Sequence, residues 1–139
     1  MINLFDYVTA HRSNDILEWS KGLQKPDRAR LEQKLARLRQ ISFELAKDTK
    51  LLAGPVLDSI WKLRVHASVM LRPHLCKGPI DNHAEYTLLI GAIEVGDRLP
   101  PDTAKKALLR QQEIEFDPAR RRVAHGENFE TLSQSGLTG

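Results

Sequence analysis

The sequence predicts an α+β domain in which helices pack on one face of a mainly antiparallel sheet. Three observations support this class. Residues 60–75 alternate between apolar and polar side chains, residues 26–47 carry apolar side chains at helical spacing, and residues 85–95 form an apolar run. The predicted order is strand, two helices, three strands and a helix, and such separated runs are typical of α+β domains.

The first 50 residues are expected to form one strand and two helices. Ile2–Val8 is aromatic and β-branched enough for a strand. Asp15 followed by Glu18 resembles a capping box that opens a short helix over Ile16–Leu23. A second, amphipathic helix runs from Pro26, a residue suited to the first helical position, to about residue 47. Its basic face is interpreted as a solvated surface: Arg28, Arg30, Lys34, Arg37 and Arg39.

A β-hairpin at residues 60–75 is the centre of the predicted fold. Residues 50–59 before it are expected to form a loop, because Gly54-Pro55 is a turn signal. By alternation, basic side chains share one face of the hairpin: Lys62, Arg64, His66, Arg72 and His74. If both strands present this face together, a three-residue link gives the following pairs: His66 with Met70, Arg64 with Arg72, and Lys62 with His74.

Two interpretations of this basic row remain open. An Arg directly opposite an Arg is unfavourable unless both side chains extend into solvent or hold an anion between them. The row is therefore either a solvated polar face or a phosphate-binding surface. The second interpretation requires Arg64 and Arg72 to converge on one open surface.

The remaining elements are a further strand of the predicted sheet and a helix that packs on it. Glu85–Val95 is apolar on both faces and is expected in the middle of the sheet. A helix follows from about residue 100 to Glu115, and Pro118 ends it. Residues 1–117 are thus expected to form the domain, and residues 118–139 a mobile, basic and then Ser/Thr/Gly-rich tail.

Composition limits the compartment and the partners. The chain has 139 residues, a net charge of +3 and a pI near 9.2, which permits an acidic or nucleic-acid partner. Cys76 is the only cysteine, so an internal disulfide and a cysteine-based zinc cluster are excluded. No run has the length of a membrane span, and the N-terminus lacks a signal-peptide layout. We expect a cytoplasmic protein without a membrane partner.

Several strings stand in the order and at the spacing of one toxin superfamily. Ser13–Gln40 resembles its opening helical pair, and Lys50–Val65 its entry into the central hairpin. Leu71-Arg72 stands where the family has an aromatic-Arg pair. Leu88–Arg110 resembles its last strand and closing helix. Over residues 2–115 the chain therefore resembles the RelE/ParE superfamily, closest to the phage-derived HigB-like branch.

This resemblance implies an endoribonuclease that cleaves mRNA at the ribosome and is opposed by a partner antitoxin. In that chemistry the RNA 2′-hydroxyl attacks its neighbouring phosphate, so no metal or cofactor is required. A base, cations around the phosphate and an acid are required. The resemblance implies Arg64, Arg72 and Arg98 as phosphate clamps and Lys62 as an RNA contact. Because His66 and His74 share the basic face of the hairpin, we expect them to carry protons. Tyr86 is expected to stack on a base or act as a weak acid.

Departures from the family pattern keep an alternative open. The HigB-like branch has a His-Gly-aromatic string where this chain has Ile90-Gly91-Ala92, and paired lysines where it has Glu94-Val95. Asp97 adds another acid before Arg98. The alternative is a non-catalytic member of the same fold, either a gyrase-directed inhibitor or a phage or mobile-element binding scaffold. A plain nucleic-acid-binding accessory protein is a third possibility.

Overall fold

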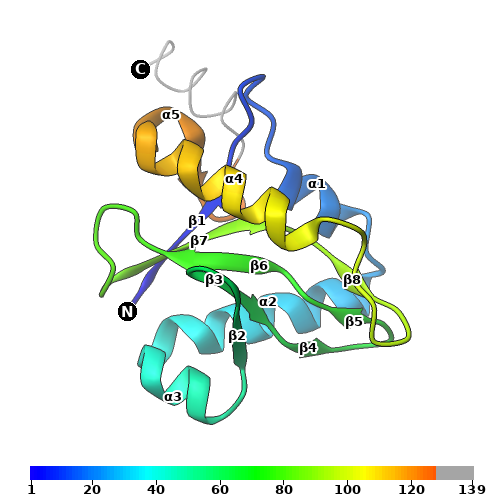
Figure 1. The fold of residues 1–139 in the computed structure, drawn as a ribbon. Helices are drawn as coiled ribbons and strands as arrows, with labels where there is room; N and C mark the ends of the chain where they lie inside the picture. The colour runs from blue at the N-terminus through cyan, green and yellow to red at the C-terminus, as the bar shows by residue number, and fades with distance from the viewer. Residues whose placement is uncertain (128–139) are drawn as a thin grey trace.

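The computed structural model describes residues 1–127, which form two sheets with helices around them (Figure 1). The helices are α1 (Asp15–Lys21), α2 (Lys25–Gln40), α3 (Phe43–Asp48), α4 (Thr103–Phe116) and α5 (Pro118–Arg121). The strands are β1 (Asn3–Tyr7), β2 (Leu52–Leu57), β3 (Ile60–Leu63), β4 (Val65–His66), β5 (Met70–Leu71), β6 (His74–Lys77), β7 (Glu85–Ile90), β8 (Ile93–Glu94) and β9 (Arg122–Ala124).

The larger sheet has the strand order β2-β3-β6-β7-β1-β9, and the smaller one has the order β4-β5-β8. Strands β1 and β7 are parallel, and the other strand pairs are antiparallel. The predicted α+β class and the mainly antiparallel sheet are thus confirmed. Among the described residues, none of the helices has both the length and the apolar character needed to cross a bilayer.

Helices cover both faces of the larger sheet, whereas the sequence predicted one covered face. On β7, Leu88 packs into the core beneath α2, and its neighbour Leu89 packs into a second core beneath α4. On β3, Leu63 and Ile60 divide between the same two cores. Figure 1 shows α4 and α5 on one side of this sheet and α2 and α3 on the other. The second helical layer follows from strands that are apolar on both faces.

Two predicted boundaries in the first half of the chain were wrong. The long predicted helix ends at Gln40, and Ser42 begins α3 by accepting a hydrogen bond from the Leu45 amide, as an N-cap does. The predicted loop before the hairpin contains β2, with Gly54-Pro55 inside it. Because β2 is an edge strand with a register irregularity, it tolerates the missing proline N–H.

The predicted strand at residues 85–95 is divided where the chain passes from the larger sheet to the smaller one. Strand β7 ends at Ile90 and β8 begins at Ile93. Gly91 lies between them, and a Cβ atom there would be 2.1 Å from Cδ2 of Trp19. The close approach of α1 therefore requires a residue without a side chain at this junction.

The chain after Pro118 continues the fold as far as it is described. Residues 118–121 form α5, and β9 pairs antiparallel with β1. The expected mobile tail therefore does not begin at residue 118. The remainder of that expectation, for residues 128–139, lies outside the described residues.

His125, just after β9, forms hydrogen bonds with residues of β1 and α2. Its Nδ1 is 2.8 Å from Oδ1 of Asp6 in β1, and its Nε2 is 3.0 Å from Oε1 of Glu32 in α2. Burial acts to lower the pKa of His125, but hydrogen bonds to Asp6 and Glu32 and their charges outweigh it and raise the pKa to about 9. The side chain is therefore an imidazolium between two carboxylates at neutral pH.

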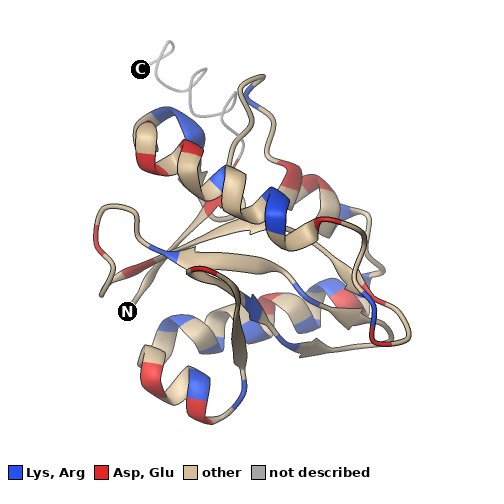
Figure 2. Cartoon of the chain, viewed as in Figure 1, with Lys and Arg blue, Asp and Glu red and all other residues tan. Residues whose placement is uncertain are grey.

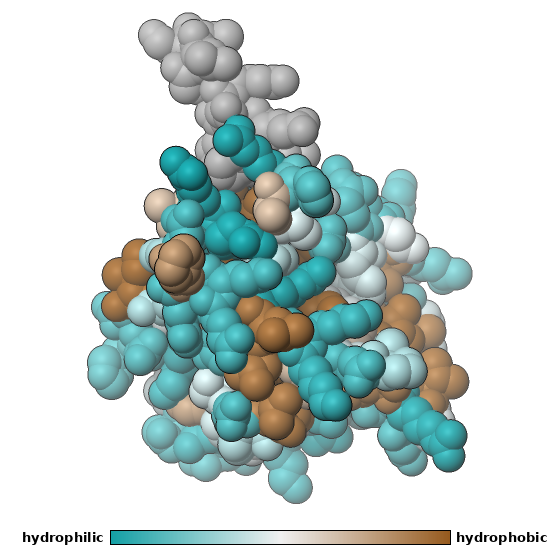
Figure 3. Space-filling view, turned by 45° about the horizontal axis from the view of Figure 1, so that its top comes forward, coloured by the Kyte–Doolittle hydropathy of each residue, from teal (hydrophilic) through white to brown (hydrophobic). Residues whose placement is uncertain are grey.

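The outer face of α4 carries both apolar and charged side chains. Figure 3 shows apolar patches among polar surface on the face turned forward. Leu109 and Phe116 on α4 are 60% and 93% exposed, and the nearby Arg121 and Glu113 form an ion pair with a 2.8 Å separation. This face carries charges of both signs.

Candidate functional site: a basic groove beside α2

The hairpin has the predicted register. The hydrogen-bonded ladders pair His66 with Met70 and Lys62 with His74. The chain changes sheets between these pairs, however, because β3 ends at Leu63 in the larger sheet and β4 begins at Val65 in the smaller one. Arg64 lies at this junction, where its backbone N–H donates to the Leu51 carbonyl.

The basic side chains of the hairpin do not share one open surface, so that prediction was wrong. Arg72 is only 3% exposed, and its guanidinium donates to the Leu71 carbonyl and lies 3.4 Å from a carboxylate oxygen of Glu94. The Nζ atom of Lys62 is 3.9 Å from the other oxygen of Glu94. The Glu94 carboxylate on β8 thus balances Arg72, which was expected to clamp phosphate, and Lys62, which was expected to contact RNA.

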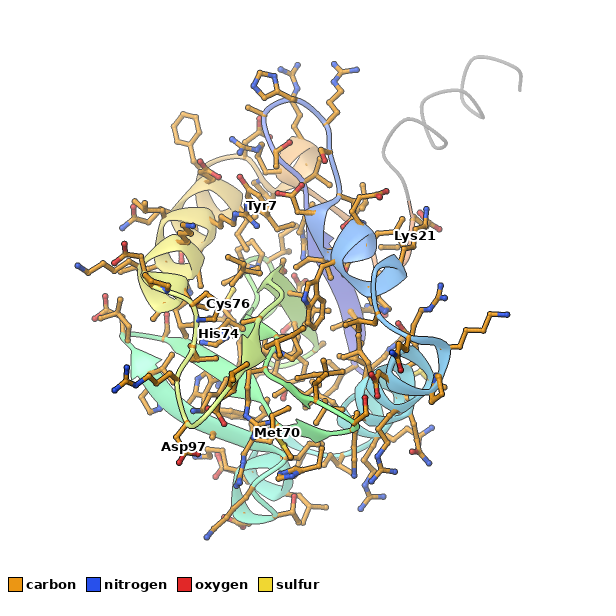
Figure 4. The ribbon with its side chains drawn as sticks, turned by 90° about the vertical axis from the view of Figure 1, so that its right-hand side faces the viewer. Tyr7, Lys21, Met70, His74, Cys76 and Asp97 are labelled. Carbon is orange, nitrogen blue, oxygen red and sulfur yellow. The ribbon has the colours of Figure 1, made fainter. Side chains whose placement is uncertain are left out.

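His74 is fully buried beside this cluster. Its Nδ1 is 2.8 Å from the Arg72 carbonyl and must donate a proton to it, so Nε2 carries the lone pair. Nε2 has no hydrogen-bond partner among the described residues. Burial lowers the pKa of His74, the Arg72 carbonyl opposes this effect, and the charge of Lys62 adds to it. Figure 4 shows His74 in the interior together with Cys76, whereas Asp97 is at the periphery.

Tyr86 and Arg98 lie away from the other candidates. Tyr86 is a core residue with 2% exposure, so its ring is not available to stack on a base. Burial raises the pKa of its hydroxyl to about 12, which makes it a poor acid near neutral pH. Arg98 is exposed in the turn after β8, where its backbone N–H and carbonyl form hydrogen bonds with the carbonyl and N–H of Val95.

Arg64 and His66 instead line a groove of about 560 Å³ between β4, α2 and the turn after α3. We name this feature the α2–β4 groove. Its lining contains no acidic residue. Six of the eight lining residues are Arg, Lys or His: Arg30, Lys34, Arg37, Lys50, Arg64 and His66. The other two are Thr49 and Leu51.

Helix α2 provides one wall of the groove, because three of its basic residues recur at helical spacing. Arg30, Lys34 and Arg37 stand at positions i, i+4 and i+7, so they share one face of the helix. The buried leucines of α2 hold the adjacent face of the helix against the sheet: Leu31, Leu35 and Leu38. Figure 2 shows Lys and Arg along α2 and in the turn after α3, where Lys50 has a positive φ of 61°.

The charges of this groove are not compensated by ion pairs. Within residues 1–127, the ion pairs involve none of its cations: Arg30, Lys34, Arg37, Lys50 and Arg64. Arg30 donates to Oε1 of Gln33 at 2.7 Å and approaches the His66 carbonyl at 3.4 Å. A concave surface with charges of one sign concentrates ions of the opposite sign, and here these are anions.

The α2 wall was not recognised as functional from the sequence. Its cations were interpreted as a solvated surface, which is the usual role of such residues on a helix. The available signal was the spacing of Arg30, Lys34 and Arg37 on one helical face, but only the fold shows that β4 lies beside that face.

Comparisons of the chain with protein-family models, curated proteins and solved structures found no match.

Proposed function

We propose that this protein binds the sugar–phosphate backbone of RNA in the α2–β4 groove. The observation that carries the proposal is the set of six Arg, Lys and His side chains in one groove whose lining has no acidic residue. Guanidinium groups match phosphate oxygens in geometry, and lysines supply further charge. The resemblance to the RelE/ParE superfamily favours RNA among the polyanions that such a groove accommodates.

The lining favours contacts with the backbone over contacts with bases. It contains no Phe, Tyr or Trp, so stacking platforms for bases are not part of it. The three cations of α2 extend over about 10 Å, from the helical rise of about 1.5 Å per residue. This length suits a few phosphates of one strand. We therefore expect binding that depends little on sequence and strongly on salt.

The test is fluorescence anisotropy of a short, labelled single-stranded RNA at several salt concentrations. With about five phosphate contacts, the slope of log K against log salt is expected near −3.5, from about −0.7 per contact. Arg37→Gln should weaken binding and make the slope shallower by about 0.7, the value of one contact. Arg28→Gln is the matched control, because it removes the same charge from α2 but does not line the groove. Equal effects of the two variants, or an absence of RNA binding, would contradict the proposal.

RNA cleavage is a second candidate function, and the exposed position of His66 beside Arg64 favours it. His66 would take the proton of the 2′-hydroxyl as the 2′-oxygen bonds to phosphorus, and Arg64 would hold the phosphoryl oxygens. The phosphorus–O5′ bond would break and the leaving oxygen would take a proton from a groove cation or water. Ribosomes would present the mRNA, and an antitoxin would oppose the activity.

This second candidate is tested by mapping RNA 5′ ends in a translation extract. His66→Gln should abolish cleavage and leave RNA binding within a few-fold, whereas His83→Gln, an exposed histidine outside the groove, should change neither. Cleavage that persists in His66→Gln would rule out this mechanism. Binding without any cleavage would favour the non-catalytic interpretation, and growth arrest with DNA damage would favour a gyrase-directed inhibitor.

A further inference from the structure

We infer that Asp27 is a positioning residue that holds the two walls of the α2–β4 groove together, an inference that rests on the proposed function. Asp27 lies in the first turn of α2, one turn before Arg30, and is 5% exposed. Its Oδ1 accepts a hydrogen bond from the Ser68 backbone N–H at 2.9 Å. Its Oδ2 accepts a second one from the Ser68 hydroxyl at 2.6 Å.

This pair of bonds joins the two walls. Ser68 belongs to the turn between β4 and β5, two residues after His66, whereas Asp27 belongs to the helix that carries the other cations. A second connection, from Arg30 Nε to the His66 carbonyl, is longer at 3.4 Å and exposed. The buried carboxylate is therefore the stronger of these two connections.

A carboxylate suits this position for two reasons. The carboxylate accepts from both donors of Ser68 at once, one on each oxygen, whereas an amide side chain accepts on one oxygen only and would meet the Ser68 hydroxyl with its NH2 group. The N-terminal end of a 16-residue helix also favours a negative charge in its first turn. Loss of the carboxylate would replace two charge-assisted hydrogen bonds with weaker neutral ones, and this would allow the β4–β5 turn to move away from α2.

Electrostatics alone predicts the opposite effect on RNA. Asp27 carries a negative charge one turn from a cationic groove, so its removal should strengthen the attraction for phosphate. A positioning role predicts weaker binding, because Arg64 and His66 would no longer face the cations of α2. The sign of the change therefore separates the two explanations.

The experiment measures RNA affinity and its salt dependence for Asp27→Asn. Binding is expected to weaken about tenfold, with a slope shallower by about 0.7, the value of the one contact made by Arg64 on the β4 wall. An unfolded fraction lowers the concentration of active protein but leaves the slope of log K against log salt unchanged. The slope therefore reports the number of phosphate contacts made by the folded groove. Ser68→Ala keeps the backbone bond and should have a smaller effect, and Ser68→Thr, which retains a hydroxyl, should restore wild-type binding.

Asp15→Asn is the matched control, because it removes the same charge from the first turn of α1, where Asp15 pairs with Arg110. If Asp27→Asn and Ser68→Ala bind RNA as tightly as the wild type, or more tightly, with the wild-type slope, the inference is overturned and the proposed function stands. If Asp27→Asn does not fold, Ser68→Ala alone decides. A wild-type protein that does not bind RNA would overturn the proposed function and the inference with it.

Discussion

The guanidinium of Arg72 lies 3.4 Å from the carboxylate of Glu94, and both side chains are largely removed from solvent. The same carboxylate lies 3.9 Å from Lys62 on its other side. An internal anion thus lies between Arg72, which was expected to hold phosphate together with Arg64, and Lys62. Arg64 has no ion pair among the described residues and lines the groove instead.

Glu94→Gln is therefore expected to destabilise the protein by about 1–3 kcal/mol, because a buried guanidinium loses its anionic partner. The free energy of unfolding from urea titration measures this change. Glu44→Gln is the control, since the Glu44 side chain is 73% exposed beside Lys47 and its substitution should change stability by less than about 0.5 kcal/mol. Equal effects of the two substitutions would show that the Arg72–Glu94 contact does not support the fold.

The His125 contacts predict a loss of stability on the alkaline side. The pKa is about 9 in the folded protein and about 6.5 in the unfolded chain, so the imidazolium is favoured by folding. Its contribution, up to about 3 kcal/mol, is complete below pH 6.5 and is lost as pH rises to 9. Urea titrations at pH 6, 7.5 and 9.5 measure it. The difference between wild type and His125→Gln should shrink over this range, and a constant difference would contradict the assignment.

His74 is expected to stay neutral at a pH where an ordinary imidazole takes up a proton. Burial lowers its pKa, and its Nδ1 proton is held by the Arg72 carbonyl. At pH 6.5, nitrogen-15 NMR should show the neutral Nδ1–H tautomer for His74, and the urea-unfolded protein at the same pH is the control. Since unfolding would allow this imidazole to protonate, His74 lowers stability as pH falls below about 6.5. A protonated His74 in the folded protein would contradict its buried placement.

Gly91→Ala is expected to destabilise the protein by about 1–3 kcal/mol, because the new methyl group would overlap the Trp19 ring. Thermal unfolding followed by circular dichroism measures the change. Gly22→Ala is the control, since a Cβ there meets its nearest atom at an ordinary 3.5 Å. A Gly91→Ala variant as stable as Gly22→Ala would show that α1 does not pack this closely on the β7–β8 junction.

Local patterns predicted the hairpin register, because alternation and link length together decide which residues face each other. They could not predict which parts of each face become covered. The burial of Arg72 depends on Glu94, which is 22 residues away in the chain, and on the division of the hairpin between two sheets. The groove was missed for a related reason. Helical spacing places Arg30, Lys34 and Arg37 on one face, but only tertiary packing sets Arg64 opposite them.

The position of β1 has a consequence for synthesis of the chain. Both of its neighbours in the sheet, β7 and β9, come from the second half of the sequence. At about 5–20 residues per second, roughly 80 residues must be translated over several seconds before Tyr7 and its strand find their first partner. During that interval an apolar strand with two open edges is exposed on the nascent chain, which makes it a natural substrate for chaperones that bind extended segments.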